Sequence, residues 1–286
     1  IESAGSARAK AATEVIEGLP ALRPSVEAGF HSLLETFVLH THPVYANLAT
    51  CCSEGEAVAK QALAGIDAGH VYVPYINPGA QLTFAIAEAR NKAQAENGNK
   101  PAIIFMQNHG LIVTGADADS CLRLHDEVNE RIAAFFGTSR QDWPQPALAP
   151  AAAGNSWLSA TPWLSRKLIG TAWDLDLFTA RALYPDQLVF LGGQLTEVKT
   201  GSLADHLMAG RPFAAKCSIF RESGEVYYHQ CAAAEARTIE ETLCAILYIT
   251  DTIINSGRTV CTMNEAGRDF ISSWESEKYR KSIAAK

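Results

Sequence analysis

The sequence predicts an α/β protein in which short buried strands alternate with longer helices. The apolar runs at residues 102–106 and 111–113 have the length and composition of strands. The segment at residues 80–96 is expected to be a helix ended by a glycine-containing turn, and residues 119–136 carry apolar side chains along one helical face. The chain has 286 residues, of which 48% are apolar and 19% charged, so it can form a full core in two domains.

The first half of the chain is expected to contain most of the strands. Its opening helix begins at Pro24 or Ser25, and Phe30, Leu33 and Leu34 give that helix an apolar face. The elements expected after it, in order, are a strand ending at residues 40–42, a helix at 46–52, a strand at 71–75, a helix at 80–96, strands at 102–106 and 111–113, and a helix at 119–136.

The second half is expected to be a smaller α+β region. Prolines interrupt residues 141–156, which predicts a first domain at 1–140, a Pro/Ala-rich linker at 141–156 and a C-terminal region at 157–286. The elements expected in that region are helices at 163–171 and 175–183, a strand at 187–191, a hairpin formed by 214–221 and 225–230, and helices at 234–255 and 265–283.

Histidines lie at the ends of two expected strands in the first half. His40 and His42 are two residues apart, so their side chains leave a strand on the same face, and Pro43 ends the strand. His109 follows the strand at 102–106 in an Asn-His-Gly turn. Three neutral imidazoles can bind zinc and leave a coordination position open for water or substrate. The alternative is a chance pair of histidines that are only hydrogen-bonded near the core.

Glu27 is the candidate acid/base of this site. It lies in the first turn of the opening helix, shares a helical face with His31, and precedes the strand that bears His40. A carboxylate beside a metal-bound substrate can take up or return a proton. The alternative is an ordinary first-turn acid that the helix dipole favours.

Three motifs together resemble the class II aldolase and adducin family. They are R-P-S-V-E at residues 23–27, V-L-H-T-H-P at 38–43 and Q-N-H-G-L-I-V at 107–113. The resemblance extends from about Arg23 to Phe136 and is greatest to the sugar-aldolase branch, including the aldolase part of bacterial rhamnose-utilisation proteins. It implies a central, largely antiparallel sheet flanked by helices, a divalent metal ion (usually zinc) bound by His40, His42 and His109, and Glu27 as the acid/base.

Two departures from the family pattern concern a substrate phosphate. Family members that act on sugar phosphates commonly have two serines before the glutamate; here Ser25 remains as a candidate substrate-binding residue, but Val26 cannot donate a hydrogen bond. The family's N-terminal helix and strands, which complete the phosphate pocket, are expected to be missing from this chain. Whether the substrate is phosphorylated therefore stays open.

The reaction that the resemblance implies is retro-aldol cleavage of a ketose or ketose phosphate, and its reverse. A sugar-phosphate epimerase or a dehydratase needs the same site, so both stay open, as does a non-catalytic adducin-like interaction protein. An unrelated metal-dependent hydrolase would leave the first and third motifs unexplained. The family also implies a homo-oligomer, expected to be a tetramer, with a protonating tyrosine often supplied by a neighbouring subunit. The sequence does not choose among the candidate tyrosines, which are Tyr45, Tyr72, Tyr75, Tyr248 and Tyr279.

Composition predicts a soluble cytoplasmic enzyme, and the resemblance implies a small-molecule sugar or sugar-phosphate substrate. The net charge of −7 argues against nucleic-acid binding, and the longest apolar runs are far shorter than the ~20 residues of a membrane helix. Seven cysteines without C-x-x-C spacing indicate free thiols in a reducing compartment, and Cys51 and Cys52 are expected to pack in a helix. The histidines expected not to be ligands are His70, His125, His206 and His229.

Overall fold

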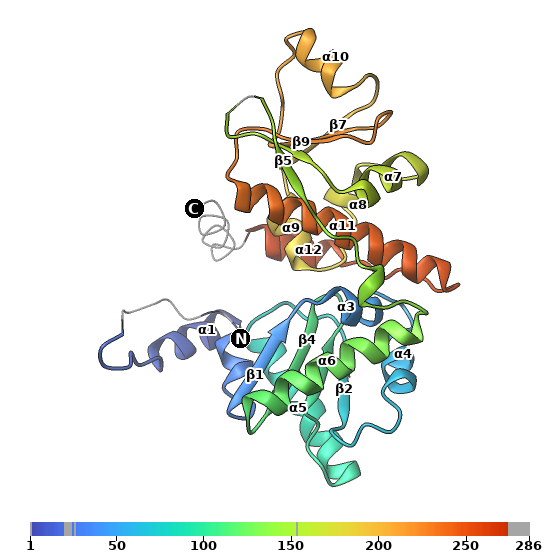
Figure 1. The fold of residues 1–286 in the computed structure, drawn as a ribbon. Coiled ribbons are helices and arrows are strands. Elements are labelled where there is room, and N and C mark those ends of the chain that lie inside the picture. Colours follow the sequence, from blue (N-terminus) through green and yellow to red (C-terminus); the bar gives the residue numbers. More distant parts are fainter. Residues whose placement is uncertain (1, 20–24, 26, 153, 274–286) are drawn as a thin grey trace. The chain divides into compact units, whose positions relative to one another are not determined.

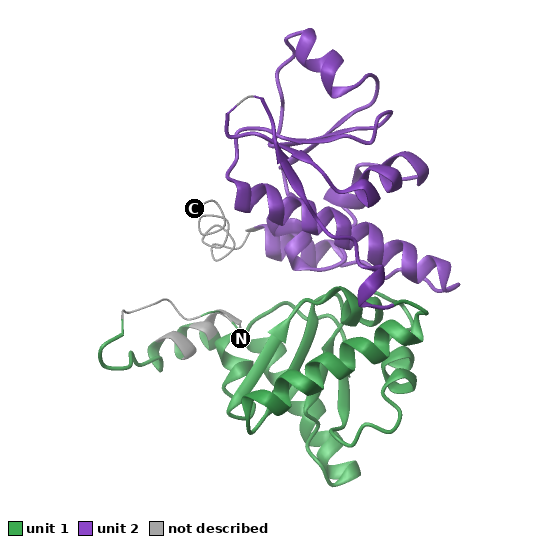
Figure 2. Cartoon of the chain, in the orientation of Figure 1, with its two compact units in different colours: residues 1–138 green, residues 139–286 purple. Residues whose placement is uncertain are grey.

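The computed structural model describes residues 2–19, 25, 27–152 and 154–273, and it divides the chain into two compact units. The first unit covers residues 1–138 and the second residues 139–286 (Figure 2). The sequence places the end of the first domain at residue 140. The C-terminal unit, expected to be the smaller one, therefore covers slightly more of the chain than the first.

A four-stranded sheet forms the centre of the first unit. Its strands are β1 (Phe37–Thr41), β2 (His70–Val73), β3 (Ile103–Met106) and β4 (Gly110–Gly115), and their order across the sheet is β1-β4-β3-β2. The β1/β4 and β3/β4 pairs are antiparallel, and only β2 runs parallel to β3. The predicted largely antiparallel sheet is thus confirmed. Strand β4 pairs with β1, which carries His40, on one side and with β3, which precedes the turn that carries His109, on the other.

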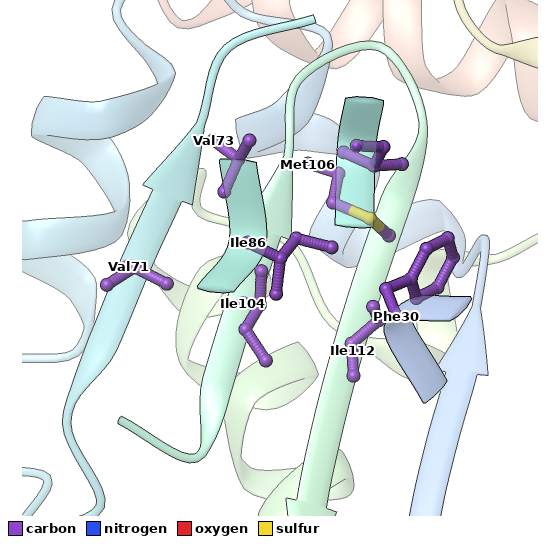
Figure 3. Close-up of a cluster of buried hydrophobic side chains, with 8 residues drawn as sticks. Phe30, Val71, Val73, Ile86, Ile104, Met106 and Ile112 are labelled. Atoms are coloured by element: carbon purple, nitrogen blue, oxygen red, sulfur yellow. The ribbon is translucent and has the colours of Figure 1, made fainter. Parts of the chain in front are cut away.

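Helices cover both faces of this sheet (Figure 1). The helices described in the first unit are α1 (Glu2–Ala11), α2 (Ala28–His31), α3 (Val44–Thr50), α4 (Gly55–Ala62), α5 (Ala80–Asn97) and α6 (Ala118–Phe135). On one face, Phe30 from α2 and Ile86 from α5 pack with Ile104 and Ile112 of the sheet (Figure 3). The residues that alternate with these along β3 and β4 face the other way, where α3 and α6 pack on β4.

The boundaries of the long helices follow local sequence signals. Asp117 caps α6 by accepting a hydrogen bond from the Ser120 N–H at 2.8 Å. The α5 helix ends at Asn97, and Gly98 follows with a φ of 81°, the left-handed conformation that favours glycine. Both helices agree with the sequence prediction to within one residue at each end.

The second unit contains a five-stranded sheet. Its strands are β5 (Leu148–Pro150), β6 (Trp157–Ser159), β7 (Leu195–Val198), β8 (Cys217–Phe220) and β9 (Val226–Tyr228), in the order β5-β6-β9-β8-β7. All pairs are antiparallel except β7/β8. Part of the segment predicted as a linker, residues 141–156, is therefore strand β5, and Pro150 fits there because β5 is an edge strand.

The helices of the second unit include one that the sequence predicts wrongly. They are the 3₁₀ helix at Arg140–Asp142, α7 (Pro162–Gly170), α8 (Asp176–Thr179), α9 (Pro185–Leu191), α10 (Leu203–Met208), α11 (Ala233–Asn255) and α12 (Glu265–Ser273). Residues 187–191 belong to helix α9, not to a strand. The helix expected at 175–183 is only the short α8, and of the helix expected at 265–283, residues 274–283 lie outside the described residues.

The physical reason for α9 lies in its first turn and its amide side chain. Pro185 opens the helix, where its fixed φ is favourable, and Gln187 accepts a hydrogen bond from the Leu183 N–H at 2.9 Å and donates one to the Leu177 carbonyl at 2.8 Å. A short apolar run such as this one fits a buried strand and a buried helix equally well by periodicity alone. Tertiary hydrogen bonds decide between them here.

None of the helices in the described residues combines the length and the apolar character that crossing a membrane requires.

Candidate metal centre

Two strand ends of the first unit bring three histidines together. His40 lies in β1 opposite Ile112 of β4, His42 follows the end of β1, and His109 lies in the turn between β3 and β4. The ring centroids are 5.4 Å apart for His40 and His42, 5.1 Å for His40 and His109, and 5.0 Å for His42 and His109. One ring nitrogen from each histidine lies within 4.8 Å of the others, a spacing that can hold a metal ion.

The Asn-His-Gly turn explains why His109 reaches this cluster. Asn108 takes a positive φ of 50°, and its N–H donates to the Thr50 carbonyl at 2.9 Å. A Cβ at Gly110 would overlap the Thr41 carbonyl oxygen and the His42 ring. Glycine at this position therefore lets β4 approach the end of β1 closely enough for His42 and His109 to face each other.

Glu27 lies beside two of the three histidines. Its carboxylate oxygens are 3.3 Å from His109 Nε2 and 3.6 Å from His40 Nδ1, and the residue is only 9% exposed. It immediately precedes α2. A surface acid at a helix start would point into solvent, whereas this carboxylate is buried and directed at the cluster.

The imidazoles keep the Glu27 carboxylate ionised. Burial by itself raises the pKa of Glu27, but the hydrogen bond with His109 and the charges of His40, His109 and His42 outweigh burial and hold the pKa well below its usual range. The pKa of His40 is also well below its usual value, because burial disfavours the imidazolium more than Glu27 stabilises it. The site thus pairs a carboxylate with a neutral imidazole at His40.

The donor set fits a divalent transition metal. His40 Nε2 is buried and has no hydrogen-bond partner among the residues that the structure describes. A buried ring nitrogen without such a partner is an uncommon arrangement, and a metal ion supplies the missing interaction. Three imidazole nitrogens beside a carboxylate suit zinc and similar ions. Three histidine ligands leave one coordination position of such an ion open for substrate.

Ser25 forms a hydrogen bond with the backbone of Glu27 in this structure. It is exposed, and its Oγ accepts a hydrogen bond from the Glu27 N–H at 3.2 Å. This contact helps to fix the backbone that carries the carboxylate. The other residues of the predicted R-P-S-V-E motif, Arg23, Pro24 and Val26, lie outside the described residues.

The sequence analysis does not identify two contacts around the cluster. His31 Nε2 lies 3.2 Å from His40 Nδ1, and Thr41 Oγ1 lies 2.8 Å from His125 Nε2. The spacing of Glu27 and His31 on one helical face is a signal that could have indicated the first contact. The second joins residues that are 84 positions apart, for which the sequence gives no signal. Through this contact, His125 on α6 holds Thr41, which lies between His40 and His42.

The remaining predicted candidates have other surroundings. His206 and His229 lie in the second unit, where their rings pack against Phe213 at centroid distances of 4.6 and 4.9 Å. Tyr75 donates a hydrogen bond to Asn77, and burial raises its pKa to about 12. Tyr248 packs against Trp143 in the second unit, and Tyr279 lies outside the described residues. The structure does not select a protonating tyrosine among Tyr45, Tyr72 and the others.

Comparison with known proteins shows which family this unit is similar to. Residues 6–135 match the family model of the class II aldolase and adducin N-terminal domain. The chain is also 34% identical over 102 residues to the uncharacterized oxidoreductase YuxG of Bacillus subtilis (strain 168). That alignment covers 35% of this chain and 13% of the relative, so the chain spans only a small part of the relative's length. No solved structure matches the chain. Over residues 6–135, the chain is therefore similar to the N-terminal domain of class II aldolases and adducins.

Proposed function

We propose that the first unit is the metal-dependent part of an aldolase-type lyase that cleaves a ketose or ketose phosphate and also catalyses the reverse addition. One observation supports the proposal above all others: a buried carboxylate lies within 3.3 and 3.6 Å of two histidines in a cluster that can hold a metal ion. His40, His42 and His109 would hold the ion, and zinc is the ion we propose. When bound, a divalent metal ion polarises a substrate carbonyl as a Lewis acid.

The residues of the chain then have separate tasks. His40, His42 and His109 fix the position at which a substrate carbonyl is bound. The Glu27 carboxylate, ionised at neutral pH, takes the proton from the carbon that becomes nucleophilic in the addition reaction and returns a proton to that carbon after cleavage. The hydroxyl proton on the aldehyde side is the task of the tyrosine that the family resemblance implies. Burial of Glu27 and His109 limits the access of water to this proton. Ser25 is proposed to contact the substrate in addition to holding Glu27.

An assay of product type tests the proposal. The zinc-loaded protein is incubated with a panel of ketoses and ketose phosphates, and aldehyde release is followed by a coupled reductase. We expect aldehyde release, and we expect Glu27→Gln to abolish it while the histidines still bind zinc. Epimer formation or loss of water without aldehyde, measured by proton NMR, would assign the site to the epimerase or dehydratase alternative. Bound zinc without turnover of any substrate would favour an adducin-like interaction protein.

We also propose that the protein is a homo-oligomer, most simply a tetramer. Support comes from the family resemblance, which implies that neighbouring subunits share an active site. Analytical ultracentrifugation of the active protein tests this, and a monomer with full activity would contradict it.

A further inference from the structure

The His31 side chain contacts one ring nitrogen of His40, a proposed metal ligand. Its Nε2 lies 3.2 Å from His40 Nδ1, a hydrogen-bond distance, with the two ring centroids 5.3 Å apart and an interplanar angle of 61°. His40 Nε2, the other nitrogen of the ring, is buried and has no hydrogen-bond partner in the described part of the chain. The two nitrogens of His40 therefore have different surroundings, and only Nδ1 has a hydrogen-bonding neighbour among the described residues.

The direction of this hydrogen bond decides whether His40 can bind a metal. If His40 Nδ1 carries the proton and donates to His31, then Nε2 keeps its lone pair. If His31 donates instead, a neutral His40 must carry its proton on Nε2, and that nitrogen cannot bind an ion. Only the first arrangement is compatible with the proposed site.

The carboxylate of Glu27 is less well placed to accept the His40 proton. Its nearer oxygen is 3.6 Å from His40 Nδ1, beyond a normal hydrogen bond, while its other oxygen lies 3.3 Å from His109 Nε2. A metal-binding histidine commonly donates the N–H of its other ring nitrogen to a carboxylate or a carbonyl. Here a second imidazole occupies the hydrogen-bonding position.

We propose that His31 is a positioning residue that accepts the His40 Nδ1 hydrogen and thereby fixes the tautomer in which His40 Nε2 binds the metal. The inference rests on the proposed metal centre and extends it. Its consequence is a separation of tasks, because a neutral imidazole orients His40 and the Glu27 carboxylate stays available for proton transfer.

The packing of α2 holds His31 at the required place. Phe30, its fully buried neighbour, contacts His40 edge-on at a centroid distance of 5.5 Å, so α2 holds the His40 ring at two points. Gly29 lets α2 approach α5 closely, since a Cβ there would lie 2.7 Å from Thr83 Oγ1. The short helix is therefore fixed against α5 while its last residue faces the cluster.

Metal affinity of matched variants gives the first test. His31→Phe keeps an aromatic ring but has no acceptor, whereas His31→Gln keeps an acceptor oxygen near the original Nε2. His70→Phe is the control, because His70 is a half-buried histidine on β2, at the opposite edge of the sheet from β1. Zinc affinity is measured by competition with a chromophoric chelator, and the visible spectrum of the cobalt-loaded protein reports ligand geometry.

We expect His31→Phe to weaken zinc binding about 10- to 100-fold, the usual effect of losing such an outer hydrogen bond. His31→Gln is expected to recover most of the affinity, and His70→Phe to leave it unchanged. Wild-type affinity in His31→Phe would overturn this inference alone. Equal losses in the Phe and Gln variants would also overturn it, because packing would then explain the effect. A wild type that binds no metal would overturn the proposed function and this inference together.

The tautomer of His40 gives a test that needs no metal. Long-range ¹H–¹⁵N spectra of histidine-labelled, metal-free protein distinguish a proton on Nδ1 from one on Nε2. We expect the Nδ1–H form in the wild type and a shift toward the Nε2–H form in His31→Phe. An Nε2–H form of His40 in the wild type would contradict the assignment of His31 as the acceptor.

Discussion

Among the residues that the structure describes, each unit buries one carboxylate, and the two carboxylates have different neighbours. Glu27 in the first unit is 9% exposed and faces the imidazoles of His40 and His109. Glu240 on α11 of the second unit is fully buried and accepts hydrogen bonds from the hydroxyls of Tyr228 and Ser159, the latter at 2.7 Å. Thr161 contributes a third hydroxyl.

These neighbours move the two pKa values in opposite directions. Burial raises the pKa of Glu240, and the hydroxyls of Thr161, Tyr228 and Ser159 offset this only in part. Around Glu27, the imidazoles overcome the same burial effect and lower the pKa. Hydroxyl groups satisfy a buried carboxyl group without fixing its charge, whereas potentially cationic groups keep it ionised. These surroundings indicate a structural role for Glu240, which joins β6 and β9 to α11, and they support the chemical role proposed for Glu27.

Removing the charge at each carboxylate should separate these roles most clearly. Glu27→Gln is expected to lower kcat about 10²- to 10⁴-fold, because an amide cannot accept the substrate proton. Glu240→Gln, the matched substitution in the second unit, should leave kcat close to the wild-type value. Steady-state assays of aldehyde release measure both. Equal losses in the two variants would contradict the assignment of chemistry to Glu27 alone.

Truncation of Glu240 should have the largest effect on stability. Glu240→Ala leaves buried hydroxyls without an acceptor, and each such group costs about 1–3 kcal/mol of unfolding free energy. Glu240→Gln should cost less, since its amide oxygen still accepts. All five tryptophans lie in residues 139–286, so their fluorescence during urea unfolding reports on the second unit. A loss below about 1 kcal/mol in Glu240→Ala would show that the hydroxyls find other partners.

The raised pKa of Glu240 also predicts how stability depends on pH. The folded state holds the Glu240 proton more tightly than the unfolded state, whose pKa is near the ordinary value of 4.5. This contribution to stability is therefore complete below that value and is lost as the pH rises through the raised pKa of the folded state. Urea unfolding from about pH 4 to about pH 8 should show this decline in the wild type. In Glu240→Gln the decline should be smaller, and an unchanged decline would mean that another group causes it.

The contact between Thr41 and His125 should have the smallest effect of the contacts considered. Thr41→Val keeps the β-branched shape but removes the 2.8 Å hydrogen bond that ties β1 to α6. We expect about 1 kcal/mol less protection of β1 amides in hydrogen exchange. Zinc affinity should fall less than in His31→Phe. A larger loss of affinity in Thr41→Val would mean that His125, more than His31, positions the β1 histidines.

The cluster of His40, His42 and His109 could be predicted from the sequence, whereas its surroundings could not. His40 and His42 follow strand periodicity, and Asn108 and Gly110 mark the turn that carries His109, so short-range patterns indicate this site. The Glu240 cluster depends on Ser159, which is 81 residues away, and no local pattern signals such a pair. The same limit explains the helix at 185–191 and the strand at 148–150, because tertiary hydrogen bonds and sheet pairing determine both.

Metal content measured by elemental analysis tests the central claim most directly. Wild-type protein and His109→Ala are prepared without chelators, supplied with zinc and freed of excess ion. The account predicts about one zinc ion per chain in the wild type and its loss in His109→Ala, because the cluster then keeps only two imidazole ligands. A wild type without metal, or a variant that keeps the same zinc content, would contradict the assignment of His40, His42 and His109 as the metal site.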